Sequence, residues 1–283
     1  MNFIKIEDIN APETEIYSRA TERQLRTIYG PEEGLFIAET AYVITCALEA
    51  GYEPVSMLVE SERLDVEASP VFDVIERLWG RDASEQLPVY VADRSVVVGM
   101  TGHHLVRGLW MLMKRKPLIS LEEFCRDKKR IAVLTDVTNP ANVGAIFRSA
   151  AALGMDGVLL THASVDPLTR RATRASMGTV FQIPWAQASL EQSDGLSLIG
   201  LLKKNGFKTV AMALTEDSTN VDNDEIRSND KVAVMLGTEG TGLPGDVISG
   251  CDYRVMIPMQ RGVDSLNVAT AGAICFWELM KGY

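Results

Sequence analysis

The stretch RIAVLTDVTNPANVGAIFRSAAALG, residues 130–154, decides the fold class of this chain. Its first part is an apolar run rich in β-branched residues, which predicts a strand over 131–136. Its second part predicts a helix over 143–153, and Gly154 stands where such a helix ends. A buried strand followed directly by a helix is the unit from which α/β domains are built.

The same alternation continues to the end of the chain. Runs such as VAVMLG are apolar throughout, as in parallel strands that are buried on both faces. Further strands are predicted over 157–161, 208–213, 231–236 and 254–257, and further helices over 194–204, 243–249 and 267–281.

A smaller α/β alternation precedes it. The helical spacing over 13–29 predicts one helix, which Gly30-Pro31 ends. The strand-like runs GLFIAE, PVSMLVE and LPVYVA then alternate with helices predicted over 40–50 and 69–79. The basic segment 114–130 contains Pro117 and is interpreted as the connection between two domains.

The composition is that of a globular protein and excludes several classes. Of 283 residues, 46% are hydrophobic and 23% are charged. No apolar run approaches the roughly 18 residues of a membrane helix, and MNFIKIEDIN has charges where a signal peptide has its apolar core. The cysteines form no CxxC pair, so we expect free thiols in a reducing cytoplasm. The residues that could bind a metal have no metal-ligand spacing, so no metal site is expected: Cys46, Cys125, Cys251, Cys275, His103, His104 and His162.

The net charge of −10 is unevenly distributed. Residues 1–100 carry nineteen acidic and eight basic side chains. Two stretches, RGLWMLMKRK and TRRATRAS, are basic instead. A basic stretch is either a solvated face or a surface for nucleic acid, and composition leaves both open.

The stretch NPANVGAIFRSA does not match the common nucleotide-binding loops. It has one glycine where the dinucleotide fingerprint has three, and it lacks the Gly-Lys-Ser/Thr ending of a Walker loop. Arg148 lies in an otherwise apolar part of the predicted helix. Such an arginine makes either a structural salt bridge or a contact to substrate, and both interpretations stay open.

Two more motifs follow. VMLGTEGTGLPGDV, residues 234–247, has four glycines, which either form a plain tight turn or let backbone groups approach a ligand. Glu239 disfavours a phosphate ligand, because its carboxylate would repel it. In VMIPMQRGVDSLNVATAGAICFWELM, residues 255–280, a helix begins near Ser265 or Asn267, and Ser265 is a candidate N-cap.

Taken in this order and at this spacing, N-x-G-x-x-x-R, G-x-E-G-x-G-L and I-P-M…S-L-N-V-A resemble the SpoU family of RNA ribose 2′-O-methyltransferases. The resemblance covers residues 130–283. It implies that S-adenosylmethionine binds in a trefoil knot of the C-terminal α/β (SPOUT) domain, and that two subunits form a homodimer through this domain. The N-terminal part is similar to the L30e-like domain that binds substrate RNA in many members.

This resemblance also implies the site residues. Arg148 acts as a base or holds a phosphate, and neither role is preferred. The implied catalytic residues are Arg148, Asn142, Glu239, Ser265 and Asn267, and the implied cofactor-binding residues are Gly237, Ile257, Met259 and Leu266.

The expected organisation is therefore an RNA-binding domain over 1–115, a linker over 116–129 and a methyltransferase domain over 130–283. The expected reaction transfers a methyl group from S-adenosylmethionine to a ribose 2′-OH of RNA, with rRNA favoured over tRNA. A non-catalytic RNA-binding protein on the same fold is the alternative. RNA contacts are expected at Arg170, Arg171 and Arg174, with no membrane and no metal involved.

Overall fold

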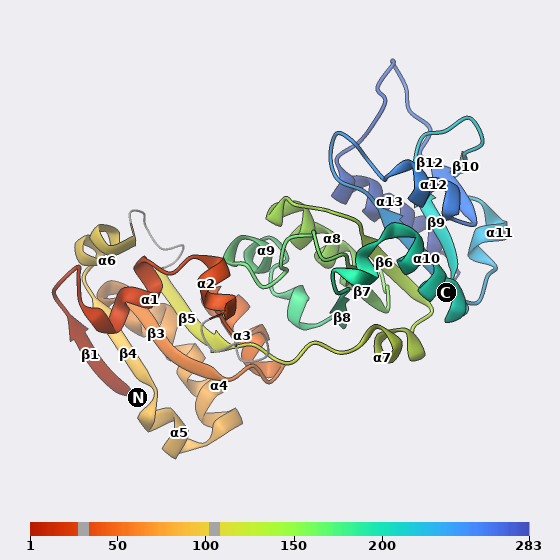
Figure 1. Ribbon diagram of the computed structural model, residues 1–283. Coiled ribbons are helices and arrows are strands. Elements are labelled where there is room, and N and C mark those ends of the chain that lie inside the picture. The colour runs from red at the N-terminus through yellow and green to blue at the C-terminus, as the bar shows by residue number, and fades with distance from the viewer. Residues whose placement is uncertain (28–33, 102–107, 283) are drawn as a thin grey trace. The chain divides into compact units, whose positions relative to one another are not determined.

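The computed structural model describes residues 1–27, 34–101 and 108–282. His103, His104 and the end of the predicted 13–29 helix lie outside these residues. The chain forms two compact units (Figure 1). Unit 1 consists of Met1–Pro117 and Leu168–Phe181, and unit 2 consists of Leu118–Pro167 and Gln182–Tyr283.

Unit 1 is built on a five-stranded mixed sheet. Its strands lie in the order β1 (Asn2–Ile6), β4 (Pro88–Ala92), β3 (Pro54–Glu60), β5 (Leu109–Lys114) and β2 (Leu35–Glu39). The first three are parallel, and β5 is antiparallel to both of its neighbours. Around the sheet lie helices α1 (Glu15–Ser18), α2 (Glu22–Thr27), α3 (Ala41–Glu49), α4 (Ser69–Trp79), α5 (Arg81–Gln86), α6 (Arg94–Thr101) and α9 (Arg170–Ala175).

The prediction of one helix over 13–29 is wrong, because the chain breaks between α1 and α2. The break comes from a capping box. The Gln24 backbone N–H donates to Thr21 Oγ1 at 3.2 Å, and the Thr21 N–H donates to Gln24 Oε1 at 2.9 Å. This reciprocal pair begins a new helix at Glu22.

The segment Leu168–Phe181 packs in a different unit from the one expected. It lies within the predicted methyltransferase domain, but it belongs to unit 1. The Phe181 ring contacts Phe36 and Tyr52 at centroid distances of 5.8 and 5.2 Å. The segment therefore contributes to the core of unit 1. Conversely, the segment 118–129, expected to be linker, belongs to unit 2 and contains helix α7 (Leu121–Arg126).

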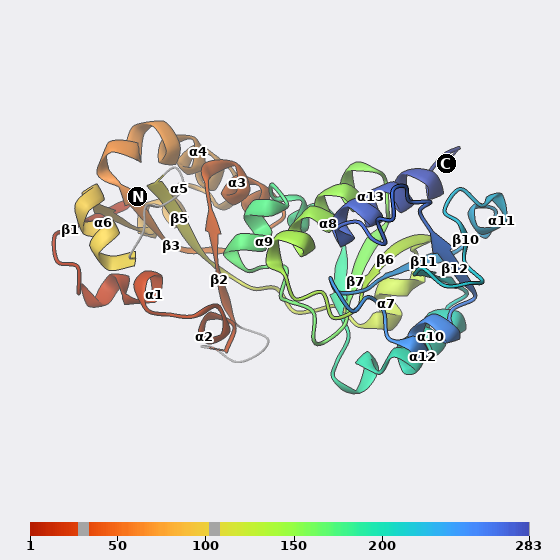
Figure 2. The same cartoon turned by 90° about the horizontal axis from the view of Figure 1, so that it is seen from above.

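Unit 2 is a parallel α/β fold. All seven strands pair in parallel, in the order β10 (Thr219–Asn220), β12 (Tyr253–Met256), β9 (Lys208–Met212), β11 (Val232–Leu236), β6 (Arg130–Leu134), β7 (Gly157–Leu160) and β8 (Trp185–Gln187). Helices α8 (Pro140–Ala152) and α13 (Val268–Leu279) pack together on one face. Helices α7, α10 (Gly195–Lys204) and α12 (Gly245–Gly250) cover the other face (Figure 2). The short helix α11 (Asp224–Arg227) lies between β10 and β11.

Most predicted elements of unit 2 are found within two residues of their expected ends. The exception is α8, which begins three residues early. Asn139 caps it by accepting a hydrogen bond from the Ala141 N–H at 3.0 Å, and Pro140 occupies the first turn. The motif residues Asn142 and Gly144 are therefore helical. That this unit is knotted stays a prediction.

Among the residues described, no helix is long and apolar enough to cross a membrane.

Candidate active site

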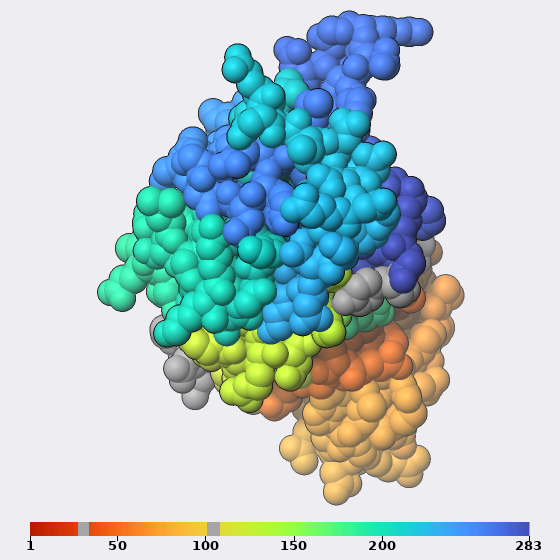
Figure 3. All heavy atoms as spheres, turned by 90° about the vertical axis from the view of Figure 1, so that its right-hand side faces the viewer, coloured from red at the N-terminus to blue at the C-terminus, as the bar shows by residue number. Residues whose placement is uncertain are grey.

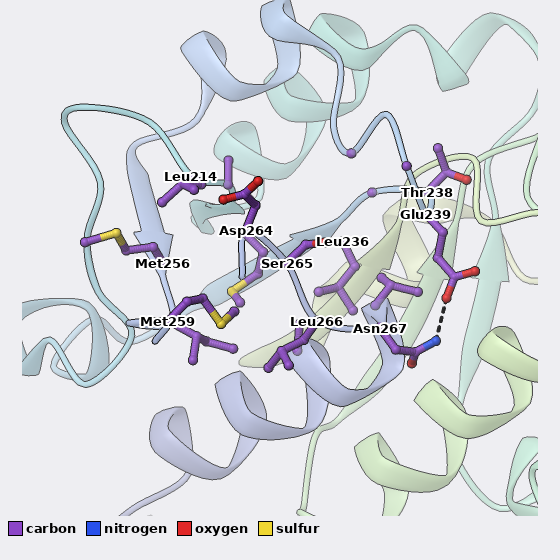
Figure 4. Close-up of a pocket in the computed structure, with 18 of the residues that line it drawn as sticks. Leu214, Leu236, Thr238, Glu239, Met256, Met259, Asp264, Ser265, Leu266 and Asn267 are labelled. Carbon is purple, nitrogen blue, oxygen red and sulfur yellow. Dashed lines mark hydrogen bonds between the residues drawn. The ribbon is translucent and has the colours of Figure 1, made fainter. Parts of the chain in front are cut away.

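A cavity of about 510 Å³ lies in unit 2, where β9, β11 and β12 end. The carboxyl ends of parallel strands are the usual location of ligand sites in such sheets, and the volume suits a small organic ligand. Apolar side chains of Leu236, Met256 and Leu266 line it together with polar groups (Figure 4). The loop between β12 and α13, which is blue in Figures 1 and 3, contributes residues that line the cavity.

The glycine-rich loop after β11 folds back on itself beside this cavity. The Gly242 N–H donates to the Thr238 carbonyl at 3.0 Å. A Cβ atom placed on Gly237 would lie 2.3 Å from the Gly242 carbonyl carbon and 2.4 Å from the Leu243 nitrogen. Gly237 is therefore required for the tight turn, and the same turn exposes backbone groups to the cavity. The tight turn, one of the two interpretations from the sequence, is therefore present, and the approach of backbone groups to a ligand stays a prediction.

Asn267 connects three of the predicted catalytic residues. Its Nδ2 donates to Asn142 Oδ1 at 3.0 Å and to Glu239 Oε1 at 2.5 Å. Its Oδ1 accepts from the N–H groups of Ala269 and Thr270, which makes Asn267 the N-cap of α13. Because both ends of the amide are engaged, the Asn267 side chain has one orientation. It joins the first turn of α8, the glycine-rich loop and the start of α13.

Asn142 is buried, yet its Nδ2 has no hydrogen-bond partner within the described parts of the chain. A buried amide without a partner costs free energy. Asn142 itself does not line the cavity and contacts it through Asn267.

Ser265 lines the cavity and is exposed. It does not cap α13, because Asn267 occupies that position. The prediction from the sequence that Ser265 is the N-cap is therefore wrong, and its hydroxyl group is not bound to the helix end.

Arg148 lies away from the cavity wall. It is exposed on α8, and it forms no ion pair or hydrogen bond with any side chain that the structure describes. Arg148 is the sixth residue after Asn142 in the helix. This spacing places the two residues about 9 Å apart along the helix axis and on different faces of the helix. A structural salt bridge, one of the two interpretations from the sequence, is not formed among these residues.

The four predicted cofactor-binding residues, Gly237, Ile257, Met259 and Leu266, all line the cavity. Sequence reasoning missed Leu214 and Asp264, which line it as well. Their positions carried a signal, since Leu214 follows a predicted strand and Asp264 directly precedes Ser265.

The predicted RNA-binding arginines lie in unit 1 and are partly engaged there. The Arg170 guanidinium lies 4.4 Å from the centroid of the Trp110 ring and pairs with Glu22 at 3.4 Å. Arg174 pairs with the buried Glu39 at 3.2 Å. Arg171 is exposed.

The four cysteines are buried, and none of them is part of a disulfide. Burial raises the pKa of the Cys275 thiol to about 12 and those of Cys125 and Cys251 to about 11. Within the described chain, no three His, Cys, Asp or Glu side chains are grouped as metal ligands.

Known proteins are similar to this chain in sequence and in fold. The SpoU rRNA methylase family matches residues 129–277, about half of the chain. A tRNA/rRNA methyltransferase of Mycobacterium bovis, described as uncharacterized, is 34% identical over 87% of this chain and 81% of its own length. The chain belongs to the SpoU rRNA methylase family. It is accordingly an RNA methyltransferase by family, as the three motifs predicted.

Solved structures agree with this assignment. The crystal structure of an RNA 2′-O ribose methyltransferase is 26% identical, covers 98% of both chains and has a TM-score of 0.76. An AdoMet-bound rRNA methyltransferase from Sinorhizobium meliloti has the same fold, with a TM-score of 0.79 over 99% of this chain and 98% of that one, at 21% identity. The predicted α/β fold class is confirmed over the length of this SpoU chain.

Proposed function

We propose that this protein transfers a methyl group from S-adenosylmethionine to a ribose 2′-OH of RNA, with rRNA as the favoured substrate. The observation that carries the proposal is the Asn142–Asn267–Glu239 chain of hydrogen bonds at the cavity of unit 2. It joins one residue from each of the three motifs of the family. A relative of known structure is named an RNA 2′-O ribose methyltransferase, which supports the ribose hydroxyl as the acceptor.

The cavity suits S-adenosylmethionine. Its volume of about 510 Å³ lies within the range of sites for small organic ligands. Ile257, Met259 and Leu266 supply apolar contacts for an adenine ring, and the turn at Gly237 lets backbone groups approach the ligand. When bound, the cofactor supplies a methyl group that is already activated on a positively charged sulfur.

The protein's own groups must then prepare the hydroxyl. A ribose 2′-OH ionises far above neutral pH, so its oxygen needs a fixed direction, and its proton would pass to solvent water as the oxygen–methyl bond forms. The hydroxyl of Ser265, which lines the cavity and is exposed, is available to orient it. Glu239 and Asn267 hold each other and Asn142 in place.

In this proposal Arg148 binds the RNA substrate. An exposed arginine without an ion pair is free to take a planar, two-point hold on an RNA phosphate. Because an arginine stays protonated in proteins, holding the phosphate fits its chemistry better than accepting a proton.

Unit 1 is assigned to RNA recognition, and its basic residues are not equally available. Lys114 pairs with Glu53 at 2.8 Å, and Lys116 lies over the Tyr52 ring at 4.9 Å. Of the three predicted arginines, Arg170 and Arg174 form ion pairs. Arg171 is exposed and forms no ion pair with another described side chain. We therefore assign RNA contact first to Arg171.

We also propose a homodimer through α13. Trp277 on this helix is 58% exposed. Large aromatic residues are enriched in protein interfaces, and a second subunit against α13 would bury this ring. The buried free thiols fit a cytoplasmic location, where such thiols stay reduced.

The test is transfer of labelled methyl groups from S-adenosylmethionine to RNA from a strain in which the gene is deleted, followed by mapping of 2′-O-methyl positions. Label in rRNA, at a position methylated in the parent strain, is expected. Label in tRNA alone would replace the proposed substrate. Cofactor binding without transfer to any RNA would favour a non-catalytic RNA-binding protein instead.

A further inference from the structure

The charged side chains that line the cavity are both acidic. Among the residues described there, these are Glu239 and Asp264, and no lysine or arginine lines the cavity. Glu239 accepts a hydrogen bond from Asn267, whereas Asp264 has no recorded hydrogen bond or ion pair with a described residue. Figure 4 shows the two carboxylates apart from each other, with Asp264 near Ser265 and Glu239 near Asn267. Asp264 is therefore separate from the Asn142–Asn267–Glu239 chain.

A tight turn brings Asp264 to the cavity. The Val263 N–H donates to the Gln260 carbonyl at 3.2 Å, and the two residues between them, Arg261 and Gly262, have φ values of 61° and 71°. Positive φ at both central positions is a feature of type I′ turns, which reverse the chain within two residues. This turn reverses the chain between the end of β12 and the start of α13.

An acidic cavity distinguishes the two forms of the proposed cofactor. S-adenosylmethionine carries a sulfonium and an ammonium group against one carboxylate, so its net charge is positive. After methyl transfer the sulfur is a neutral thioether, and S-adenosylhomocysteine has no net charge. A carboxylate in the wall attracts the first form more strongly than the second.

We propose that Asp264 determines this specificity: it favours the cationic methyl donor over the neutral product, and so promotes exchange of the product for new donor. The proposal rests on the proposed function, because it assumes that this cavity holds S-adenosylmethionine. Asp264 is exposed and its charge is partly screened by water. The expected preference is therefore modest, about 2- to 5-fold in the ratio of the two dissociation constants.

The test is calorimetry on the full chain with S-adenosylmethionine, S-adenosylhomocysteine and sinefungin, a stable analogue with an amine in place of the methylated sulfur. In Asp264→Asn, affinity for the two cationic ligands should fall by about 2- to 5-fold, while S-adenosylhomocysteine should bind as in the wild type. Asp264→Glu should keep the preference. Glu191→Gln, which removes one negative charge outside the cavity, should leave all three affinities unchanged. The preference of the wild type should decrease as salt is raised.

The outcomes separate the two proposals. If none of the ligands binds the wild type, the proposed function fails, and this inference fails with it. If all three bind and Asp264→Asn changes them equally or not at all, Asp264 does not discriminate by charge, and the proposed function stands.

Discussion

Replacement of Arg148 by alanine should remove methyl transfer and leave the fold intact. Arg148 is exposed and makes no hydrogen bond or ion pair with a described side chain that the substitution would break. Surface substitutions of this kind change the free energy of unfolding by about 0.5 kcal/mol or less. For a chain of this size that corresponds to a shift in melting temperature of roughly 1–2 °C.

The effect on the reaction should be far larger. The loss of the side chain that holds the substrate phosphate, and so positions the reacting hydroxyl, lowers the rate by about 100-fold, which raises the activation free energy by about 2.7 kcal/mol. S-adenosylhomocysteine affinity should not change, because Arg148 does not line the cavity. Arg148→Lys keeps the charge but loses the planar fork, so it should be nearly as impaired.

The assay combines thermal melting, calorimetry with S-adenosylhomocysteine and single-turnover methylation of RNA. Arg126→Ala, at the exposed end of α7, is the matched control and should behave as the wild type in all three. A structural arginine would give another pattern, since loss of one partner of a buried ion pair costs about 3–5 kcal/mol and would lower the melting temperature by roughly 6–20 °C. That pattern, or methylation at the wild-type rate, would refute the assignment.

Three other outcomes are expected. Gly237→Leu should abolish S-adenosylhomocysteine binding in calorimetry, because a side chain there would force the glycine-rich turn apart; retained affinity would contradict this. Arg170→Ala should destabilise unit 1 by about 1–2 kcal/mol in thermal melting, because the ring contact and the ion pair are lost. Arg171→Ala should melt as the wild type. In RNA binding, its slope of log affinity against log salt concentration should be reduced by about one. Burial raises the pKa of Asp252, but the hydrogen bonds from Thr209 and the charges of Lys203 and Lys208 together lower it more, so that the pKa lies below 3.8. The ionised carboxylate therefore stabilises the native state above that pH, and the stabilisation is lost as the pH falls through the lowered pKa. In acid unfolding, Asp252→Asn should be less stable at neutral pH and should lose less stability between about pH 5 and pH 2 than the wild type.

Local patterns in the sequence determined most of unit 2. Its strands are apolar throughout because they are buried on both faces, and its helix ends carry the residues that supply caps, such as Asp194 before α10. These signals act within a few residues, so they can be read without knowledge of the partners. The three motifs and their order were sufficient to predict the family, and the cofactor-binding residues that they implied all line one cavity.

Interactions between residues far apart in the sequence were decided by the tertiary structure. The sequence did not indicate that Leu168–Phe181 packs in unit 1, because its partners Phe36, Tyr52 and Trp110 lie more than fifty residues away. The basic charge of this segment was visible from the sequence, but the pairing of Arg170 with Glu22 was not.

The same holds at the site. The sequence identified Asn142, Glu239 and Asn267 as a set, but their hydrogen bonds span separations of up to 125 residues and follow from how α8, the glycine-rich loop and α13 converge. It could not choose between a salt bridge and a free side chain for Arg148, because that depends on which groups the fold brings to its face of α8. The chemistry of each residue type was determined by the sequence. Which of those residues are engaged with one another, and which remain free for a ligand, was decided only when the strands and helices packed, because burial and pairing are properties of the whole fold.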